Sequence, residues 1–172
     1  MSTTVNQSAL NRNAARLGSI LCRHGQKIAT AESCTGGWIA QTLTAIPGSS
    51  SWFEAGFVTY SNTMKQTVLK VPVELLQGPH APGAVSEQTV LAMARGALVL
   101  ANVDWAVATS GIAGPGGGSA NKPVGLVWIG WACRYGSTAS VYNFDGNRDQ
   151  IRRQAVAAAL DGLLQRVQSL AD

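Results

Sequence analysis

Apolar residues recur at every third or fourth position in several stretches of the chain, and this spacing predicts amphipathic helices. One such stretch starts near Leu10 and ends at His24-Gly25, where a glycine can adopt the left-handed conformation that closes a helix. A long helix is predicted after Ser86, because serine is a preferred N-cap and Glu87 is favourable in the first turn. Further helices are expected at residues 35–43, 62–70 and 148–169, with the apolar face of the last one extending to Leu170.

Short apolar runs bounded by turn residues predict strands between these helices. They lie at residues 27–31, 57–60, 105–109, 124–133 and 138–144. The last two are joined by the turn 134–137 and should form an antiparallel hairpin, whereas helices separate most of the others. This alternation predicts a three-layer α/β/α fold with a mixed sheet. Without a linker or an internal repeat, residues 1–172 are expected to form a single domain.

Charged residues are scarce, at 13% of the chain against 46% hydrophobic residues, and the formal net charge is +4. The basic residues are scattered, apart from a small group at Arg148, Arg152 and Arg153. This distribution argues against a nucleic-acid interface and fits one small anion better. The N-terminus lacks an apolar run of signal-peptide length next to basic residues, and no 18-residue apolar stretch without charges occurs, so a soluble, cytoplasmic protein is expected.

The cysteines and histidines do not form a recognisable metal-binding pattern. Cys22, Cys34 and Cys133 lie far apart and have neither zinc spacing nor the even count of a disulfide framework. They are expected to be reduced, and neither a metal nor another cofactor is predicted. Only two histidines are present, of which His24 ends a predicted helix and His80 lies in a loop rich in glycine and proline.

Polar and glycine residues follow the predicted strands at three places, where ligand sites of open α/β sheets are found. The first is Ser33-Cys34-Thr35-Gly36-Gly37, which offers two nucleophiles beside backbone N–H groups that can bind an anion or a developing oxyanion. The same residues also fit a serine N-cap followed by a tight turn.

The second place is Tyr60, at a strand end, with Lys65 on the helix that follows. From the local sequence alone, a solvated lysine and a half-buried tyrosine are the favoured explanation of this pair. The third place is the loop from Thr109 through Ser110 and Gly111 to Gly118, which matches neither a P-loop nor a dinucleotide fingerprint and also fits a plain flexible loop.

Several of these blocks together resemble the CinA C-terminal domain family. The blocks occur in the family's order, cover about residues 7–168, and read AESCTGG (31–37), GFVTYSN (56–62) with Lys65, GAVS (83–86), SGIAGP (110–115), KPVG (122–125) and Arg148-Asp149 with Arg152. The resemblance implies hydrolysis of the carboxamide of nicotinamide mononucleotide to nicotinic acid mononucleotide and ammonia, in pyridine-nucleotide salvage.

The resemblance also implies roles for individual residues. Ser33 matches the family's nucleophile, Lys65 its base, and Tyr60 a neighbour that activates or orients the hydroxyl. A lysine can take the serine proton if burial lowers its pKa toward neutrality. Substrate contacts are implied for Cys34, Thr35, Gly36, Gly37, Thr109, Ser110, Gly111 and Arg148. Among these, Arg148 would meet the nucleotide phosphate, with Lys122 as a second cation.

The sequence departs from the family pattern at two positions. Residues 77–85 are about two residues longer than usual, which separates His80 from Gly83, and Gly116 stands where many relatives have an acidic residue. Neither departure involves Ser33, Tyr60 or Lys65.

Two other functions fit the sequence. One is a cysteine amidase that uses Cys34 with His80, which would require a lowered thiol pKa. The other is a non-catalytic nucleotide-binding accessory protein linked to competence or DNA damage. Five tryptophans and a surface with few charges also lead us to expect a homodimer.

Overall fold

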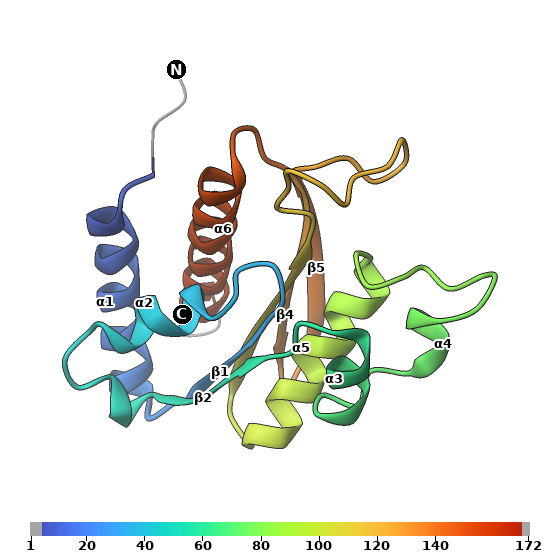
Figure 1. Cartoon of the computed structure of the whole chain (residues 1–172). Coiled ribbons are helices and arrows are strands. Elements are labelled where there is room, and N and C mark those ends of the chain that lie inside the picture. The colour runs from blue at the N-terminus through green and yellow to red at the C-terminus, as the bar shows by residue number, and fades with distance from the viewer. Residues whose placement is uncertain (1–4, 170–172) are drawn as a thin grey trace.

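The computed structural model describes residues 5–169, in which five strands form one sheet with helices on both faces (Figure 1). The strand order is β2-β1-β3-β4-β5. The strands are β1 (Ile28–Glu32), β2 (Phe53–Val58), β3 (Trp105–Gly111), β4 (Leu126–Cys133) and β5 (Gly136–Asn143). The first three are parallel, whereas β4 and β5 form an antiparallel hairpin beside β3. The predicted three-layer α/β/α fold with a mixed sheet is therefore confirmed.

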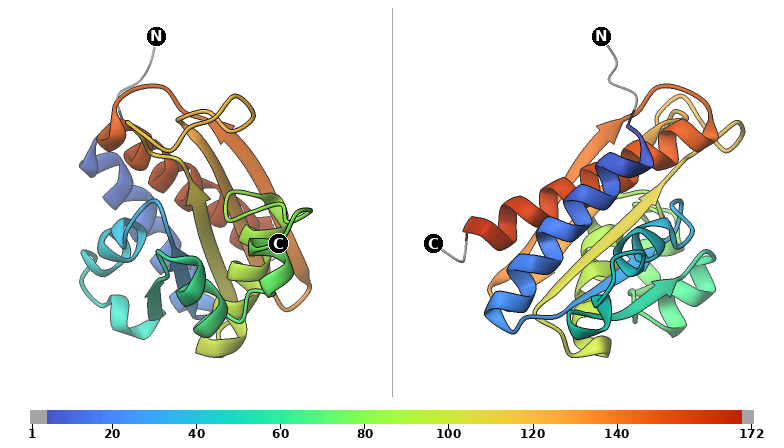
Figure 2. Two further views of the ribbon diagram at one scale, coloured as in Figure 1. Left: turned by 45° about the vertical axis from the view of Figure 1, so that its right-hand side comes forward. Right: turned by 90° about the vertical axis from the view of Figure 1, so that its left-hand side faces the viewer.

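Three helices cover one face of the sheet: α1 (Gln7–His24), α2 (Trp38–Thr44) and α6 (Arg148–Ser169). Figure 2 shows α1 and α6 side by side across this face. Their apolar stripes bury Leu17, Leu21 and Leu163 against Ile28 and Trp131 of the sheet. This layer is the larger of the two hydrophobic cores and holds α6 against the carboxyl end of β1.

The opposite face carries α5 (Glu87–Ala101), with the short helices α3 (Asn62–Thr67) and α4 (Val73–Leu76) beside it. Val90, Met93 and Ala97 of α5 are fully buried, and the sheet residues under them include the alanines Ala31 and Ala108. Small side chains on the strands let the helix lie close to the sheet. The layer also packs Leu69, just after α3, which ties the position of α3 to α5.

The predicted helix ends at Gly25 and Ser86 are confirmed. Gly25 has φ 60°, and the hydroxyl of Ser86 accepts the N–H of Thr89 at 3.3 Å. The helix predicted from residue 35 begins only at Trp38, because Gly36 and Gly37 adopt positive φ angles of 62° and 92° and extend the turn.

Other boundaries differ by a few residues. The strand predicted at 57–60 runs from Phe53 to Val58, and the helix predicted at 62–70 ends at Thr67. The third strand continues two residues further, to Gly111, because it pairs with β4 along its whole length. The helix α4 and the 3-10 helix Ser49–Ser51 were not predicted, since neither is long enough to show an apolar period.

The ends of the expected domain, residues 1–4 and 170–172 with Leu170, lie outside the described residues. Among the helices that the structure describes, none combines the length and apolar character needed to cross a bilayer.

We predict that Gly96→Ala destabilises the protein by about 1–3 kcal/mol, although alanine favours a helix over glycine by about 1 kcal/mol. A Cβ at Gly96 would lie 2.1 Å from the backbone oxygen of Leu69, so α5 and the segment after α3 would have to separate. Urea unfolding checks this, with Val99→Ala on the 77% exposed side of the same helix as the control. A neutral or stabilising Gly96→Ala would contradict the close approach.

Candidate active site

Ser33 and Lys65 meet at the carboxyl end of the parallel strands. Ser33 directly follows β1, whereas Lys65 lies on α3, which follows β2, and the two strands pair side by side. The ammonium nitrogen of Lys65 lies 3.0 Å from the Ser33 hydroxyl. The parallel pairing therefore brings together two side chains that are 32 residues apart in sequence.

The Lys65 side chain is buried, with only 1% of the residue exposed. Its nitrogen also contacts two backbone oxygens, those of Thr59 at 2.8 Å and Tyr60 at 3.0 Å. Burial disfavours the charged amine and lowers the pKa of Lys65 from its ordinary value of 10.5 to about 8. The solvated-lysine alternative is therefore wrong.

The three contacts suit either protonation state of the amine. A protonated Lys65 donates one N–H bond to each of the three oxygens, that of the Ser33 hydroxyl included. A neutral lysine has two N–H bonds and one lone pair. With the two N–H bonds donated to the Thr59 and Tyr60 oxygens, the lone pair is left for the Ser33 hydroxyl. In this state Ser33 donates its proton to Lys65, which is the arrangement a serine nucleophile needs.

The turn after Ser33 has two groups of backbone amides. Gly36 N–H is bonded to the Ser33 oxygen at 3.0 Å, and Gly37 N–H to the Glu32 carboxylate at 3.0 Å. Within residues 5–169, the N–H groups of Cys34 and Thr35 donate no hydrogen bond to another residue. Of the four residues 34–37 that the sequence offered for an oxyanion, only these two therefore keep a free donor.

Glu32 fixes the second half of this turn. Its fully buried carboxylate accepts the Thr35 hydroxyl at 2.7 Å and the N–H groups of Gly37, Ile39 and Ala40 at 2.8–3.0 Å. The N-terminus of α2 is thus capped by a carboxylate, which suits the positive end of a helix. The alternative of Ser33 as the N-cap is wrong, and no local sequence signal indicates this role of Glu32.

Arg152 of α6 fixes the first half of the turn. It donates from Nε to the Cys34 oxygen at 3.1 Å and from Nη2 to the Thr35 oxygen at 2.9 Å. The sequence showed Arg152 only as part of a basic group and of the family pattern. Its contact with residues 34–35 spans more than a hundred positions, so no local signal could have revealed it.

Tyr60 and Arg148 lie at the mouth of the site. Tyr60 is 62% exposed, and its hydroxyl contacts Arg148 at 3.2 Å. Arg148 also donates to the Gly114 oxygen at 2.7 Å. Both side chains line a cavity of about 200 Å³, together with Cys34 and the glycine loop that includes Gly111 and Gly114.

The remaining residues suggested by the sequence take different positions. Thr109 is buried, with its hydroxyl 2.8 Å from that of Thr35, and Ser110 donates to the Ala84 oxygen at 2.7 Å. Both hydroxyls are therefore bonded to groups around the turn at residues 34–37 and help to hold these segments in place. Lys122 donates to the Pro82 and Val85 oxygens, so its ammonium supports the base of the glycine loop.

The structure does not support a cysteine nucleophile. Cys34 is buried, and the loss of solvation raises the pKa of its thiol to about 11. His80 is exposed in the turn after α4 and makes no hydrogen bond with Cys34. In the part of the chain that the structure describes, no group of His, Cys, Asp and Glu residues could hold a metal ion.

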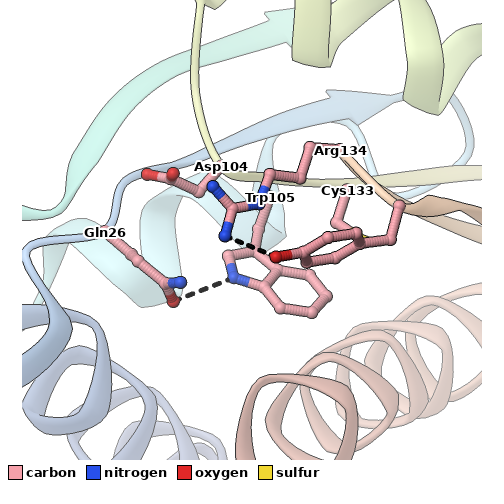
Figure 3. A pocket seen from close by; sticks show the side chains of 6 residues that line it. Gln26, Asp104, Trp105, Cys133 and Arg134 are labelled. Atoms are coloured by element: carbon pink, nitrogen blue, oxygen red, sulfur yellow. Dashed lines mark hydrogen bonds between the residues drawn. The ribbon is translucent and has the colours of Figure 1, made fainter. Parts of the chain in front are cut away.

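A second, smaller cavity of about 50 Å³ lies at the opposite end of the sheet (Figure 3). It is lined by residues before β1 and β3 and at the end of β4, including Gln26, Asp104 and Cys133. The indole N–H of Trp105 donates to Gln26 there at 3.0 Å. Among the residues that line this cavity, no nucleophile is hydrogen-bonded to a base.

The chain is similar to several known proteins over most of its length. The CinA C-terminal domain family matches residues 10–167. The nicotinamide-nucleotide amidohydrolase PncC of Pseudomonas putida is 54% identical over 152 residues, covering 88% of this chain and 93% of that protein. The protein of the same name from Escherichia coli K12 is 50% identical, covering 92% and 94%. The crystal structure of the competence/damage inducible protein CihA from Agrobacterium tumefaciens has a TM-score of 0.87 and 44% identity, covering 96% and 98%.

We predict that Cys34 resists a thiol reagent at pH 8 in the folded protein, because its thiol is buried and its pKa lies near 11. Reaction with a disulfide reagent in a Cys133→Ser background should label the exposed Cys22 alone, and Cys22→Ser should remove this reaction. Unfolding should expose Cys34. Labelling of native Cys34 as fast as Cys22 would contradict the burial of the thiol.

Proposed function

This chain belongs to the CinA C-terminal domain family, and we propose that it hydrolyses the carboxamide of nicotinamide mononucleotide to nicotinic acid mononucleotide and ammonia. The observation that carries the proposal is the 3.0 Å contact between Ser33 and the buried Lys65. Relatives named nicotinamide-nucleotide amidohydrolase cover nearly the whole chain at 50–54% identity.

The proposed reaction begins with Ser33. Neutral Lys65 takes the hydroxyl proton while the oxygen attacks the carboxamide carbon, and a tetrahedral intermediate forms. The free N–H groups of Cys34 and Thr35 receive its oxyanion. Protonated Lys65 then gives its proton to the leaving nitrogen, ammonia departs, and water hydrolyses the acyl-serine by the same route.

We propose that Tyr60 has two roles, one for its backbone oxygen and one for its ring. Its backbone oxygen holds the Lys65 amine, whereas its exposed ring lies at the mouth of the cavity beside Arg148. The hydroxyl contacts Arg148 and not Ser33, so we assign the ring to substrate placement and the backbone to orientation of the base. Thr109 and Ser110 then hold the turn, and Gly111 lines the cavity.

The cellular role that follows from this reaction is pyridine-nucleotide salvage in the cytoplasm, and we propose that the active form is a homodimer. A non-catalytic nucleotide-binding role is the alternative, because solved relatives are described as competence or damage-inducible proteins. A buried lysine beside a serine favours the enzyme, since binding alone needs no desolvated base.

The first test is ammonia release from nicotinamide mononucleotide by the purified protein. Wild type and Cys34→Ala should release ammonia, whereas Ser33→Ala and Lys65→Met should be slower by on the order of 10³-fold or more. Binding of the nucleotide without release by wild type would sink the enzyme proposal and support the accessory role.

The pH dependence of kcat/KM should report Lys65. The proposed base must be neutral, and the pKa of Lys65 lies near 8, so the rate should rise with pH below 8 and level off above it. A steady-state series from pH 6 to 10 measures the midpoint. A profile that is flat between pH 6 and 9 would exclude a base with this pKa.

Arg148 should be needed for the nucleotide phosphate and not for the chemistry. Arg148→Met should raise KM for nicotinamide mononucleotide by about 10- to 100-fold, the range expected for lost hydrogen bonds to a charged group, with a smaller change in kcat. Nicotinamide riboside, which lacks the phosphate, is the matched control substrate. If Arg148→Met lowered kcat/KM equally for the nucleotide and for the riboside, Arg148 would not be the residue that binds the phosphate.

A further inference from the structure

Arg152 forms a two-pronged contact with the turn that follows the nucleophile. One edge of its guanidinium group meets two successive backbone oxygens, those of Cys34 and Thr35, at 3.1 and 2.9 Å. Arg152 comes from α6, so the contact joins the carboxyl end of β1 to a helix that lies far away in sequence. Its planar fork holds two N–H bonds side by side in a fixed geometry, whereas a lysine ammonium is a single donor atom on a flexible stem.

The contact determines the direction of the amides. The Cys34 oxygen and the Thr35 N–H belong to one planar trans peptide group, in which the two bonds point in opposite directions. Because the oxygen points at Arg152, the Thr35 N–H must point away from it. This N–H is one of the two that donate no hydrogen bond to another residue within residues 5–169.

The surroundings of Arg152 hold it in place. Gly36 has φ 62°, and a Cβ there would lie 3.2 Å from Nη2 of Arg152, so a larger residue would crowd the guanidinium group. The guanidinium carbon also lies 5.3 Å from the ring centre of Trp38, at the start of α2. The Trp38 indole in turn donates to Gln7 of α1 at 3.3 Å. Three helices thus fix the position of the cation.

A cation bonded to the two carbonyl oxygens also polarises their peptide groups. Hydrogen bonds in a chain strengthen one another, and this effect is larger where water is excluded. The Thr35 N–H therefore becomes a better donor for a negative oxygen on its other side. Arg152 itself does not contact the reacting atoms: two hydrogen bonds, with one peptide group between them, separate it from the oxyanion.

We infer that Arg152 is a positioning residue for amide hydrolysis, which orients and polarises the Cys34–Thr35 peptide group, whose N–H bond receives the oxyanion. This inference rests on the proposed function. It differs from a role in phosphate binding, because both donating nitrogens are directed at backbone oxygens of the turn. It also differs from a purely structural role, because its effect should appear in the transition state and not in substrate affinity.

The test compares Arg152→Met and Arg152→Lys with Arg153→Met. Arg153 is the matched control, because its guanidinium carbon also lies over Trp38, at 5.0 Å, but its hydrogen bond goes to Asp149. Loss of one oxyanion donor typically costs about 10²- to 10³-fold in kcat. We therefore expect kcat for nicotinamide mononucleotide to fall by about 30-fold or more in both Arg152 variants. KM should stay within about threefold, and Arg153→Met should resemble wild type.

Two readouts separate positioning from packing. The midpoint of the pH profile should not move in Arg152→Lys, because Lys65 is untouched. The 3-formyl analogue of the nucleotide, whose aldehyde can form a tetrahedral adduct with Ser33, should lose affinity in parallel with kcat/KM, whereas the product should bind as before. If Arg152→Met does not fold, Arg152→Lys carries both measurements.

The outcomes are distinct. An active wild type with unchanged kcat in Arg152→Lys and Arg152→Met would overturn the positioning role alone. A loss confined to KM would overturn it as well and would move Arg152 to the substrate site. A wild type that releases no ammonia would overturn the proposed function, and the inference with it.

Discussion

The burial of the Lys65 amine is the constraint on which the site depends. A folded protein tolerates a buried lysine amine only if the amine loses its charge or its N–H groups have acceptors. Here the backbone oxygens of Thr59 and Tyr60 accept these N–H groups. The same burial lowers the pKa of the amine to about 8 and makes it a base near neutral pH. The unfolded chain binds this proton more tightly, so the cost to folding is greatest below pH 8 and declines as the pH rises toward 10.5.

The turn after Ser33 is held from both ends by opposite charges. The Glu32 carboxylate accepts hydrogen bonds from the N–H groups at the start of α2, whereas the Arg152 guanidinium donates to the backbone oxygens of residues 34 and 35. Each charge is satisfied by backbone groups, so the two do not need to pair with each other. Between them remain the amides of Cys34 and Thr35, which the turn cannot satisfy by itself. A buried donor without a partner is costly, and in the proposed mechanism the binding of the oxyanion recovers this cost.

Much of this arrangement could be predicted from the sequence. The apolar periods gave the helices α1, α5 and α6, because each is long enough to show its stripe. Ser33, Tyr60 and Lys65 were predicted as site residues because strand ends, glycines and a family pattern coincide there. Glu32 and Arg152 were not assigned roles, since a carboxylate before a serine and an arginine on a distant helix have no local signature. Their roles depend on the register of β1 and on the packing of α6.

The layers of the fold explain why the proposed base and the groups that hold the proposed oxyanion donors come from opposite faces of the sheet. Lys65 is carried by α3, which is fixed to the α5 layer through Leu69, whereas Arg152 and the start of α2 belong to the α1 and α6 layer. Ser33 sits at the end of β1, between the two, where both layers can reach it. A change in the packing of either layer therefore shifts one catalytic partner relative to the other. The precision of the site then depends on the small residues that bring both layers close to the sheet, such as Ala31 and Ala108 beneath α5.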